Sequence, residues 1–221
     1  MKRYIAGLLF VALAFNLAFG QVAQSPYTAD ILAFKKQDSL TPPQQHAILF
    51  IGSSSFTRWK DVKVYFPGYT IINRAYGGST LVDQVRDVKD IVYPYNPRQI
   101  VIYCGENDFA QNDTLSPRTG TGRFKHLYEL IRSRLPEAKI TYVSMKPSPS
   151  RWKLADKFVA ANREIRSYLR HQPRTSYVDV WKKMLAKDHK PIESIFLQDQ
   201  LHMNATGYHI WQKAIKSHLI K

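Results

Sequence analysis

The segment AILFIGSSSF, residues 47–56, places five apolar residues ahead of a glycine and three serines. An apolar run of this length that ends in small residues is typical of a buried β-strand followed by a turn. The segment therefore predicts a strand over residues 47–51. The small hydroxyl residues at its end leave room for one serine to face a ligand at the edge of a sheet.

Four further runs have the same apolar character and are rich in β-branched or aromatic residues, which favours strands. They are 69–72 (YTII), 99–103 (QIVIY), 139–145 (KITYVSM) and 176–180 (SYVDV). Between and after these runs, apolar residues recur with the period of an α-helix. The periodic stretches are 124–135, 154–169 and 208–219.

This alternation of strands and helices favours right-handed crossovers between parallel strands, with helices on both faces of the sheet. We therefore expect an α/β fold, a three-layer α/β/α, flavodoxin-like arrangement around a parallel five-stranded sheet. A chain of 221 residues with 44% hydrophobic content can bury one sizeable core, and no linker divides it. Residues 21–221 are expected to form one domain. The single cysteine, Cys104, follows an apolar run, which favours a buried apolar role.

The first twenty residues have the pattern of a secretory signal peptide. Lys2 and Arg3 precede an apolar stretch, and the small residue Gly20 precedes a plausible cleavage point. A retained membrane anchor is the alternative, but it needs about 20 apolar residues, and polar Asn16 interrupts this stretch. We expect residues 1–20 to be removed, no transmembrane segment to remain, and the mature protein to be secreted or periplasmic.

The chain is strongly basic, with a formal net charge of +15 that falls to +13 when residues 1–20 are removed. A charge of this size predicts weak attraction to anionic surfaces such as lipid or acidic glycan. The lysines and arginines are scattered and never form a block of five, so the sequence indicates no nucleic-acid partner. A solvated basic coat without a partner is the simpler explanation of the charge.

Polar residues and glycines follow the predicted strands at their carboxyl ends, where ligands bind in parallel α/β sheets. The blocks are Gly52–Ser54, Asn73–Gly78, Gly105–Asp108 and, ahead of the last helix, Asp199–His202. Each block also has a purely structural explanation. Serines, Asn and Asp can cap a helix or turn, adjacent glycines can form a tight turn, and a histidine can bond to a backbone carbonyl.

The order of the four blocks resembles the SGNH or GDSL hydrolase family, in which Ser, Gly, Asn and His come from four separate blocks. FIGSSSFT, NRAYGGS, GEND and DQLH stand in that order, and the resemblance spans residues 47–220. It implies the SGNH hydrolase fold and makes Ser54 the nucleophile. Two departures are present, because Ser53 stands where the family usually has aspartate and Glu106 stands where glycine is frequent.

The residue types in these blocks suit a serine hydrolase. A serine hydroxyl becomes a nucleophile when a base takes its proton, and His202 can act as that base when Asp199 holds its other ring nitrogen. The resemblance also implies an oxyanion hole formed by the backbone N–H groups of Ser54 and Gly78 and by the side-chain amide of Asn107. We therefore expect these groups to meet above one edge of the sheet.

Other chemistries find less support in the sequence. There is no His-Glu-x-x-His motif, no pair of cysteines and no phosphate-binding glycine loop, so we expect no metal and no cofactor. Other histidines compete poorly for the role of base. His46, for example, precedes the first strand and is expected at the opposite end of the sheet.

The sequence thus predicts a secreted serine esterase that cleaves a small-molecule or glycan ester through an acyl-enzyme intermediate. Aromatic residues expected in loops, Trp59, Tyr95 and Trp152, favour a short acyl group on a glycan, because aromatic faces stack on sugars. A lysophospholipase or lipase-type acylhydrolase is the first alternative. A non-catalytic glycan-binding module of the same fold is the second, and a basic adhesion protein for nucleic acid or membrane, based on charge alone, is the third.

Overall fold

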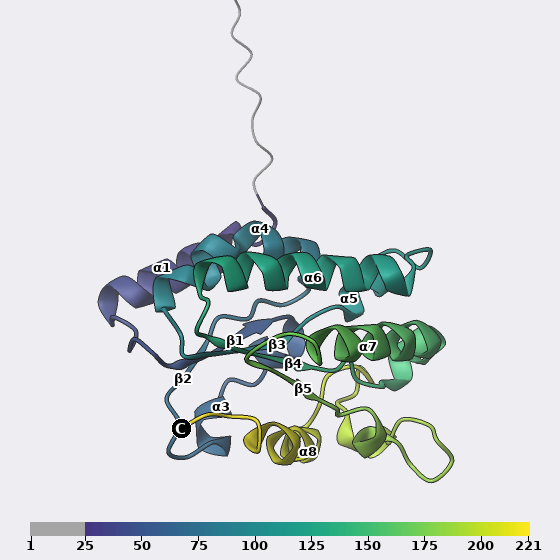
Figure 1. Cartoon of the computed structure of the whole chain (residues 1–221). Coiled ribbons are helices and arrows are strands. Elements are labelled where there is room, and N and C mark those ends of the chain that lie inside the picture. Colours follow the sequence, from purple (N-terminus) through teal and green to yellow (C-terminus); the bar gives the residue numbers. More distant parts are fainter. Residues whose placement is uncertain (1–24) are drawn as a thin grey trace, which may run out of the picture.

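Five parallel strands form one sheet at the centre of the molecule, with helices on both of its faces (Figure 1). The computed structural model describes residues 25–221. The strands are β1 (Ile48–Gly52), β2 (Ile71–Asn73), β3 (Gln99–Tyr103), β4 (Lys139–Val143) and β5 (Thr175–Val178). Their order across the sheet is β2-β1-β3-β4-β5, and every pairing is parallel. The predicted three-layer α/β fold is confirmed.

The strands begin and end within two residues of the predicted positions, and the early end of β4 has a visible physical cause. Strand β4 ends at Val143, whereas the sequence predicted a strand that continues to Met145. The backbone N–H and C=O of Met145 bond to the side-chain amide of Asn162, each at 2.9 Å, instead of to a neighbouring strand. The amide group therefore satisfies the backbone where the strand stops, and the chain can turn toward the carboxyl edge of the sheet.

Two helical layers cover the sheet, and in Figure 1 they lie above and below it. One layer contains α1 (Thr28–Leu40), α4 (Leu81–Ile91), α6 (Pro117–Arg134) and α7 (Ala155–Leu169). The other contains α2 (Ser54–Thr57), α3 (Val62–Tyr65) and α8 (Ala205–Lys216). The short helix α5 (Glu106–Gln111) follows β3. Helices α6, α7 and α8 match the predicted periodic stretches, whereas α1 and α4 were not predicted.

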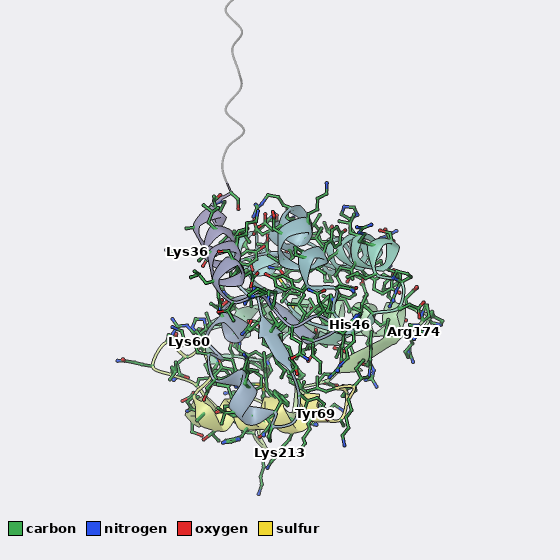
Figure 2. The ribbon with its side chains drawn as sticks, turned by 90° about the vertical axis from the view of Figure 1, so that its left-hand side faces the viewer. Lys36, His46, Lys60, Tyr69, Arg174 and Lys213 are labelled. Atoms are coloured by element: carbon green, nitrogen blue, oxygen red, sulfur yellow. The ribbon has the colours of Figure 1, made fainter. Side chains whose placement is uncertain are left out.

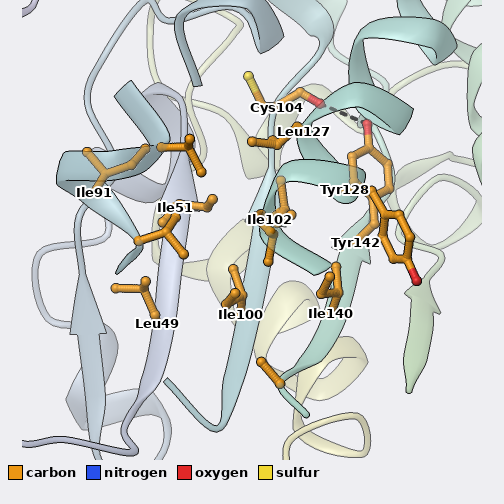
Figure 3. Packing of buried hydrophobic residues seen from close by; sticks show 14 of the residues in the cluster. Leu49, Ile51, Ile91, Ile100, Ile102, Cys104, Leu127, Tyr128, Ile140 and Tyr142 are labelled. Atoms are coloured by element: carbon orange, nitrogen blue, oxygen red, sulfur yellow. Dashed lines mark hydrogen bonds between the residues drawn. The ribbon is translucent and has the colours of Figure 1, made fainter. Parts of the chain in front are cut away.

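The larger core cluster lies between the sheet and the layer that contains α4 and α6. Figure 3 shows aliphatic side chains of neighbouring strands packed side by side, among them Leu49, Ile100 and Ile140. Cys104 lies in this cluster with 2% of its surface exposed, as its apolar surroundings predicted. The Tyr142 hydroxyl donates to the backbone carbonyl of Cys104 at 2.8 Å, which ties β4 to the chain directly after β3 (Figure 3).

The expectation that Trp59 and Tyr95 are loop aromatics available for stacking on sugars is wrong. Trp59 is fully buried and stacks on Tyr208 with ring centroids 4.8 Å apart. Tyr95 is 2% exposed, and its hydroxyl donates to Asp38 and accepts from Arg74. Both rings are core residues because the fold gives their apolar faces neighbours and the Tyr95 hydroxyl polar partners.

Trp152, the third aromatic in that prediction, is half-buried. Its ring stacks on the half-buried Trp181, with the ring centroids 6.1 Å apart. It belongs to a 3₁₀ segment, Pro149–Leu154, that follows β4 and leads into α7. Trp152 is therefore the one aromatic of the three that keeps an accessible surface.

The amino-terminal end of the sheet faces the viewer in Figure 2. His46, Tyr69 and Arg174, which precede β1, β2 and β5, are labelled there. His46 therefore lies at the end predicted for it, away from the strand carboxyl ends. The C-terminal segment is fixed at this same end, because the backbone carbonyl of His218 accepts hydrogen bonds from Gln99 at 2.9 Å and from Lys139 at 2.8 Å.

The predicted signal peptide, residues 1–20, lies outside the described residues. Within residues 25–221, no helix combines the length and the apolar character needed to cross a membrane.

Candidate active site

Ser54 is positioned by the close approach of β1 to β3. Gly52 ends β1 with a φ of +131°, and a Cβ on it would lie 1.9 Å from the backbone oxygen of Tyr103, so only glycine fits. The next N–H, from Ser53, donates to that same Tyr103 oxygen at 2.9 Å. Ser54 then opens α2, which places its side chain at the carboxyl edge of the sheet.

His202 and Asp199 reach the same edge from a tight loop ahead of α8. The Leu197 N–H donates to the His202 carbonyl at 2.7 Å, which closes the loop. One carboxylate oxygen of Asp199 accepts the backbone N–H groups of Leu201 and His202 at 3.0 and 2.9 Å. These bonds hold the carboxylate against the loop and leave its other oxygen for the imidazole.

The three predicted side chains form one hydrogen-bonded series. His202 Nε2 lies 2.8 Å from Ser54 Oγ, and His202 Nδ1 lies 2.6 Å from the free oxygen of Asp199. Ser54 and His202 are 148 positions apart in the chain and come from opposite ends of it. The structure therefore brings together the residues that the sequence assigned to nucleophile, base and orienting acid.

The protonation states at this site suit proton transfer. Burial lowers the pKa of His202, and this effect outweighs the opposing hydrogen bond that the imidazole donates to Asp199. For Asp199, partial burial favours the neutral form, but hydrogen bonds from the ring and backbone of His202 outweigh it and lower its pKa. At neutral pH the imidazole is therefore neutral and the carboxylate is ionised, so Nε2 can accept a proton from Ser54.

The turn that contains Gly78 lies against Ser54, and Asn107 is bonded to the preceding Ser53. Gly78 has a φ of +83°, and a Cβ on the preceding Gly77 would be 3.9 Å from the Cβ of Ser54, which brings this turn against the serine. The Asn107 Nδ2 group donates to Ser53 Oγ at 2.7 Å and to the carbonyl of Ser79 at 2.9 Å. Both hydrogens of the amide therefore already have acceptors.

A buried ionic cluster that the sequence did not predict adjoins Asn107. Lys146, 1% exposed, contacts both carboxylate oxygens of Glu106 at 3.3 and 3.2 Å. Arg151 donates to Glu106 at 3.3 Å and to the Asn107 side-chain oxygen at 2.6 Å. Both cations follow β4, so their place at the carboxyl edge was the available signal. Ser53, Ser54, Asn107 and Arg151 line one small cavity.

In this cluster, the opposite charges of Glu106 and Lys146 each favour the ionised form of the other group. Burial by itself favours neutral Glu106, but the positive charges of Lys146 and Arg151 outweigh burial and lower its pKa. Burial lowers the pKa of Lys146, and the negative charge of Glu106 opposes that shift. Glu106 is therefore an ionised anchor that holds two cationic side chains beside the site.

Of the polar residues that follow the strands, Asp108 has the capping role that a purely structural explanation requires, whereas Ser53 does not. Asp108 accepts the backbone N–H of Leu81 at 2.9 Å and pairs with Arg123 at 2.7 Å, so it supports the start of α4. Ser53 occupies the N-cap position of α2, but its side chain makes no cap hydrogen bond. In the part of the chain that the structure describes, no group of three or more His, Cys, Asp and Glu residues could hold a metal ion.

The three-layer α/β/α fold, with ordered Ser, Gly, Asn and His blocks at the carboxyl edge of its sheet, defines the SGNH class of α/β proteins. The model of the GDSL-like lipase/acylhydrolase family matches residues 38–210, and the chain belongs to this family. A search of curated protein sequences found no match.

Solved structures share the fold. A GDSL-like lipase from Bacteroides thetaiotaomicron has a TM-score of 0.73 and 20% identity, with 86% of this chain and 97% of that chain covered. A candidate acylhydrolase from Bacteroides fragilis has a TM-score of 0.74 and 20% identity, with 86% and 96% covered. A carbohydrate esterase family 3 protein from Talaromyces cellulolyticus has a TM-score of 0.60 and 14% identity, with 78% and 95% covered.

Proposed function

We propose that this protein is an exported serine esterase that cleaves carboxylic esters through an acyl-enzyme intermediate. The observation that carries the proposal is the series Ser54 Oγ, His202 Nε2, His202 Nδ1 and Asp199, joined at 2.8 and 2.6 Å. His202 takes the Ser54 proton as Oγ attacks the ester carbonyl and then gives it to the departing alcohol. A water molecule, activated by the same imidazole, releases the acid.

The carbonyl oxygen becomes negatively charged during each attack and needs donors that are already in place. The Ser54 N–H is the first of α2, and the first N–H groups of a helix have no acceptor within it. We assign the backbone N–H groups of Ser54 and Gly78 to this role. The amide of Asn107 supports them indirectly, because its two hydrogens are bonded to Ser53 Oγ and to the carbonyl of Ser79. The positive φ of Gly78 lets its backbone turn toward the serine without a side chain in the way.

We further propose a short acyl group, such as acetyl, carried on a glycan. The cavity beside Ser54 is small, and hydroxyl, amide and charged side chains from Ser53, Asn107, Glu106 and Arg151 contribute to its lining. Such a lining suits a small acyl group better than a long apolar chain. Trp152 offers a partly exposed ring next to Arg151, and a carbohydrate esterase shares the fold.

Esters of graded acyl length test this function. We expect fluorophosphonate to label Ser54, and we expect kcat/KM on p-nitrophenyl esters to be highest for acetate and to fall as the chain lengthens. Acetylated xylan or peptidoglycan fragments should be better substrates than long-chain lysophospholipids. A protein that stays unlabelled would be the non-catalytic binding module, and a maximum at long chains would indicate a lipase-type acylhydrolase.

The pH dependence of hydrolysis should follow His202. Protonated imidazole cannot accept the Ser54 proton, and burial disfavours that protonated form by lowering the pKa below its ordinary value of 6.5. We therefore expect kcat/KM to rise with pH through a midpoint below 6.5 and to be level at neutral pH. The positive charge of Arg58 also lowers the pKa of His202. Arg58→Gln should move the midpoint upward, and a wild-type midpoint above 7 would contradict the assignment.

A further inference from the structure

The two departures from the family pattern, Ser53 and Glu106, lie on one hydrogen-bonded chain. Glu106 accepts from Arg151, Arg151 donates to the side-chain oxygen of Asn107, and the Asn107 amide donates to Ser53 Oγ. Lys146 anchors the far end through its contacts with Glu106. The chain therefore runs from a buried ion pair to the residue directly before the nucleophile.

From Arg151 to Ser53, the hydrogen bonds of this chain point the same way. The Arg151 guanidinium donates at 2.6 Å to Asn107, which donates in turn at 2.7 Å to Ser53. Hydrogen bonds arranged head to tail polarise one another, and a cationic donor at the start strengthens the effect. Each bond therefore makes the hydrogen at the end of the chain a better donor.

This series of hydrogen bonds ends at the hydroxyl hydrogen of Ser53. A serine hydroxyl has one hydrogen to donate and two lone pairs to accept with. Ser53 Oγ accepts from Asn107, and it has no acceptor for its own hydrogen among residues 25–221. The side chain is 6% exposed and lines the cavity that Ser54 lines. A buried hydroxyl beside the nucleophile thus has an unused donor.

We propose that the Ser53 hydroxyl is a catalytic donor that stabilises the oxyanion, with Arg151 and Asn107 as the positioning residues behind it. This inference rests on the proposed esterase function and deepens it. Both hydrogens of the Asn107 amide are already bonded, so the amide acts on the oxyanion through Ser53. As the ester carbonyl oxygen gains negative charge, the Ser53 O–H donates to it while Oγ still accepts from Asn107.

The family's usual aspartate could not fill this role. An ionised carboxylate accepts hydrogen bonds but has no hydrogen to donate, and its negative charge would oppose an oxyanion nearby. If Ser53 were only an acceptor that holds Asn107 in place, aspartate would serve as well or better, because charge-assisted bonds are stronger. The two roles therefore predict opposite results for Ser53→Asp.

Four single variants and one double variant, assayed as the full chain on a p-nitrophenyl ester that wild type hydrolyses, test the proposal. Ser53→Ala should lower kcat about 100-fold, the loss typical of one oxyanion donor, with KM nearly unchanged. Ser53→Asp should lose as much, whereas Ser53→Thr, which keeps a hydroxyl, should recover most of the loss. Arg151→Gln should lower kcat to a smaller degree, and its effect should largely disappear in the Ser53→Ala background, because both act through one donor.

Two further measurements separate catalysis from folding. Affinity for a short alkyl boronic acid, which mimics the tetrahedral intermediate, should fall in parallel with kcat, while thermal unfolding shows that each variant is folded. Ser133→Ala removes an exposed hydroxyl on α6 and should leave kcat unchanged. Wild-type kcat in Ser53→Ala or in Ser53→Asp would overturn the donor role. A wild-type chain inactive on every ester would overturn the esterase function and this inference with it.

Discussion

Ser54→Ala is expected to abolish ester hydrolysis while the protein remains folded. Loss of the nucleophile in a Ser-His-Asp enzyme lowers kcat by about 10⁶-fold, and what remains comes from binding and the oxyanion hole. His202 and Asp199 would keep their contact with each other, but no hydroxyl would lie at 2.8 Å from Nε2. Steady-state kinetics and fluorophosphonate labelling would measure the loss.

Ser55→Ala provides the matched control for this variant. Ser55 is the next hydroxyl in the chain, is 1% exposed and lines the same cavity, but within residues 25–221 its side chain has no hydrogen bond with His202. Hydrolysis and labelling should persist in Ser55→Ala and disappear in Ser54→Ala. Equal activity of wild type and Ser54→Ala would place the chemistry elsewhere.

The largest expected effect on stability comes from Glu106→Gln. The exchange removes the negative charge that Lys146 and Arg151 face, and both cations stay in place with side chains 1% and 19% exposed. Breaking a buried ion pair by removing one partner costs about 3–5 kcal/mol, because the remaining charge lies in a medium of low dielectric constant. Urea unfolding of the variant should show a loss of this size.

Two comparisons make the Glu106 result specific. Glu137→Gln removes a carboxylate that is 77% exposed and pairs with Arg174 at the surface, so its cost should stay below about 1 kcal/mol. Adding Lys146→Met to Glu106→Gln removes one buried charge that has lost its partner, and this should recover part of the lost stability. If Glu106→Gln costs no more than Glu137→Gln, the cluster does not stabilise the fold.

The strand pattern could be predicted from the sequence, and the helices only in part. The run 99–103 is apolar after Gln99 and buried at every position, because parallel strands are buried on both faces. Helix α1 gave no such signal, since Ile31 is its single buried residue and its apolar residues Leu32 and Leu40 are exposed. Helix α4 begins with a capping box between Thr80 and Asp83, a local signal that was available in the sequence.

The grouping of the candidate catalytic side chains could be predicted because they stand in a recognisable order, at the end of a strand or ahead of the last helix. Ser54, His202 and Asp199 needed only residue type and block order. The ion pair of Glu106 with Lys146 could not be predicted in the same way, because its members are 40 positions apart and the contact exists only after folding. The predicted exposure of aromatic side chains was wrong for a related reason, since Trp59 meets Tyr208 and Trp211 of the distant helix α8 only after folding.

The anchored C-terminal segment has a practical consequence for handling the protein. Gln99 and Lys139 hold the His218 carbonyl at the amino ends of β3 and β4, whereas Ser54 follows the carboxyl end of β1. An affinity tag or a surface tether joined after Lys221 would therefore extend from the end of the sheet opposite to Ser54. When the protein is immobilised on a resin or a sensor chip in this orientation, the carboxyl edge of the sheet that carries Ser54 should remain accessible to bulky, polymeric esters.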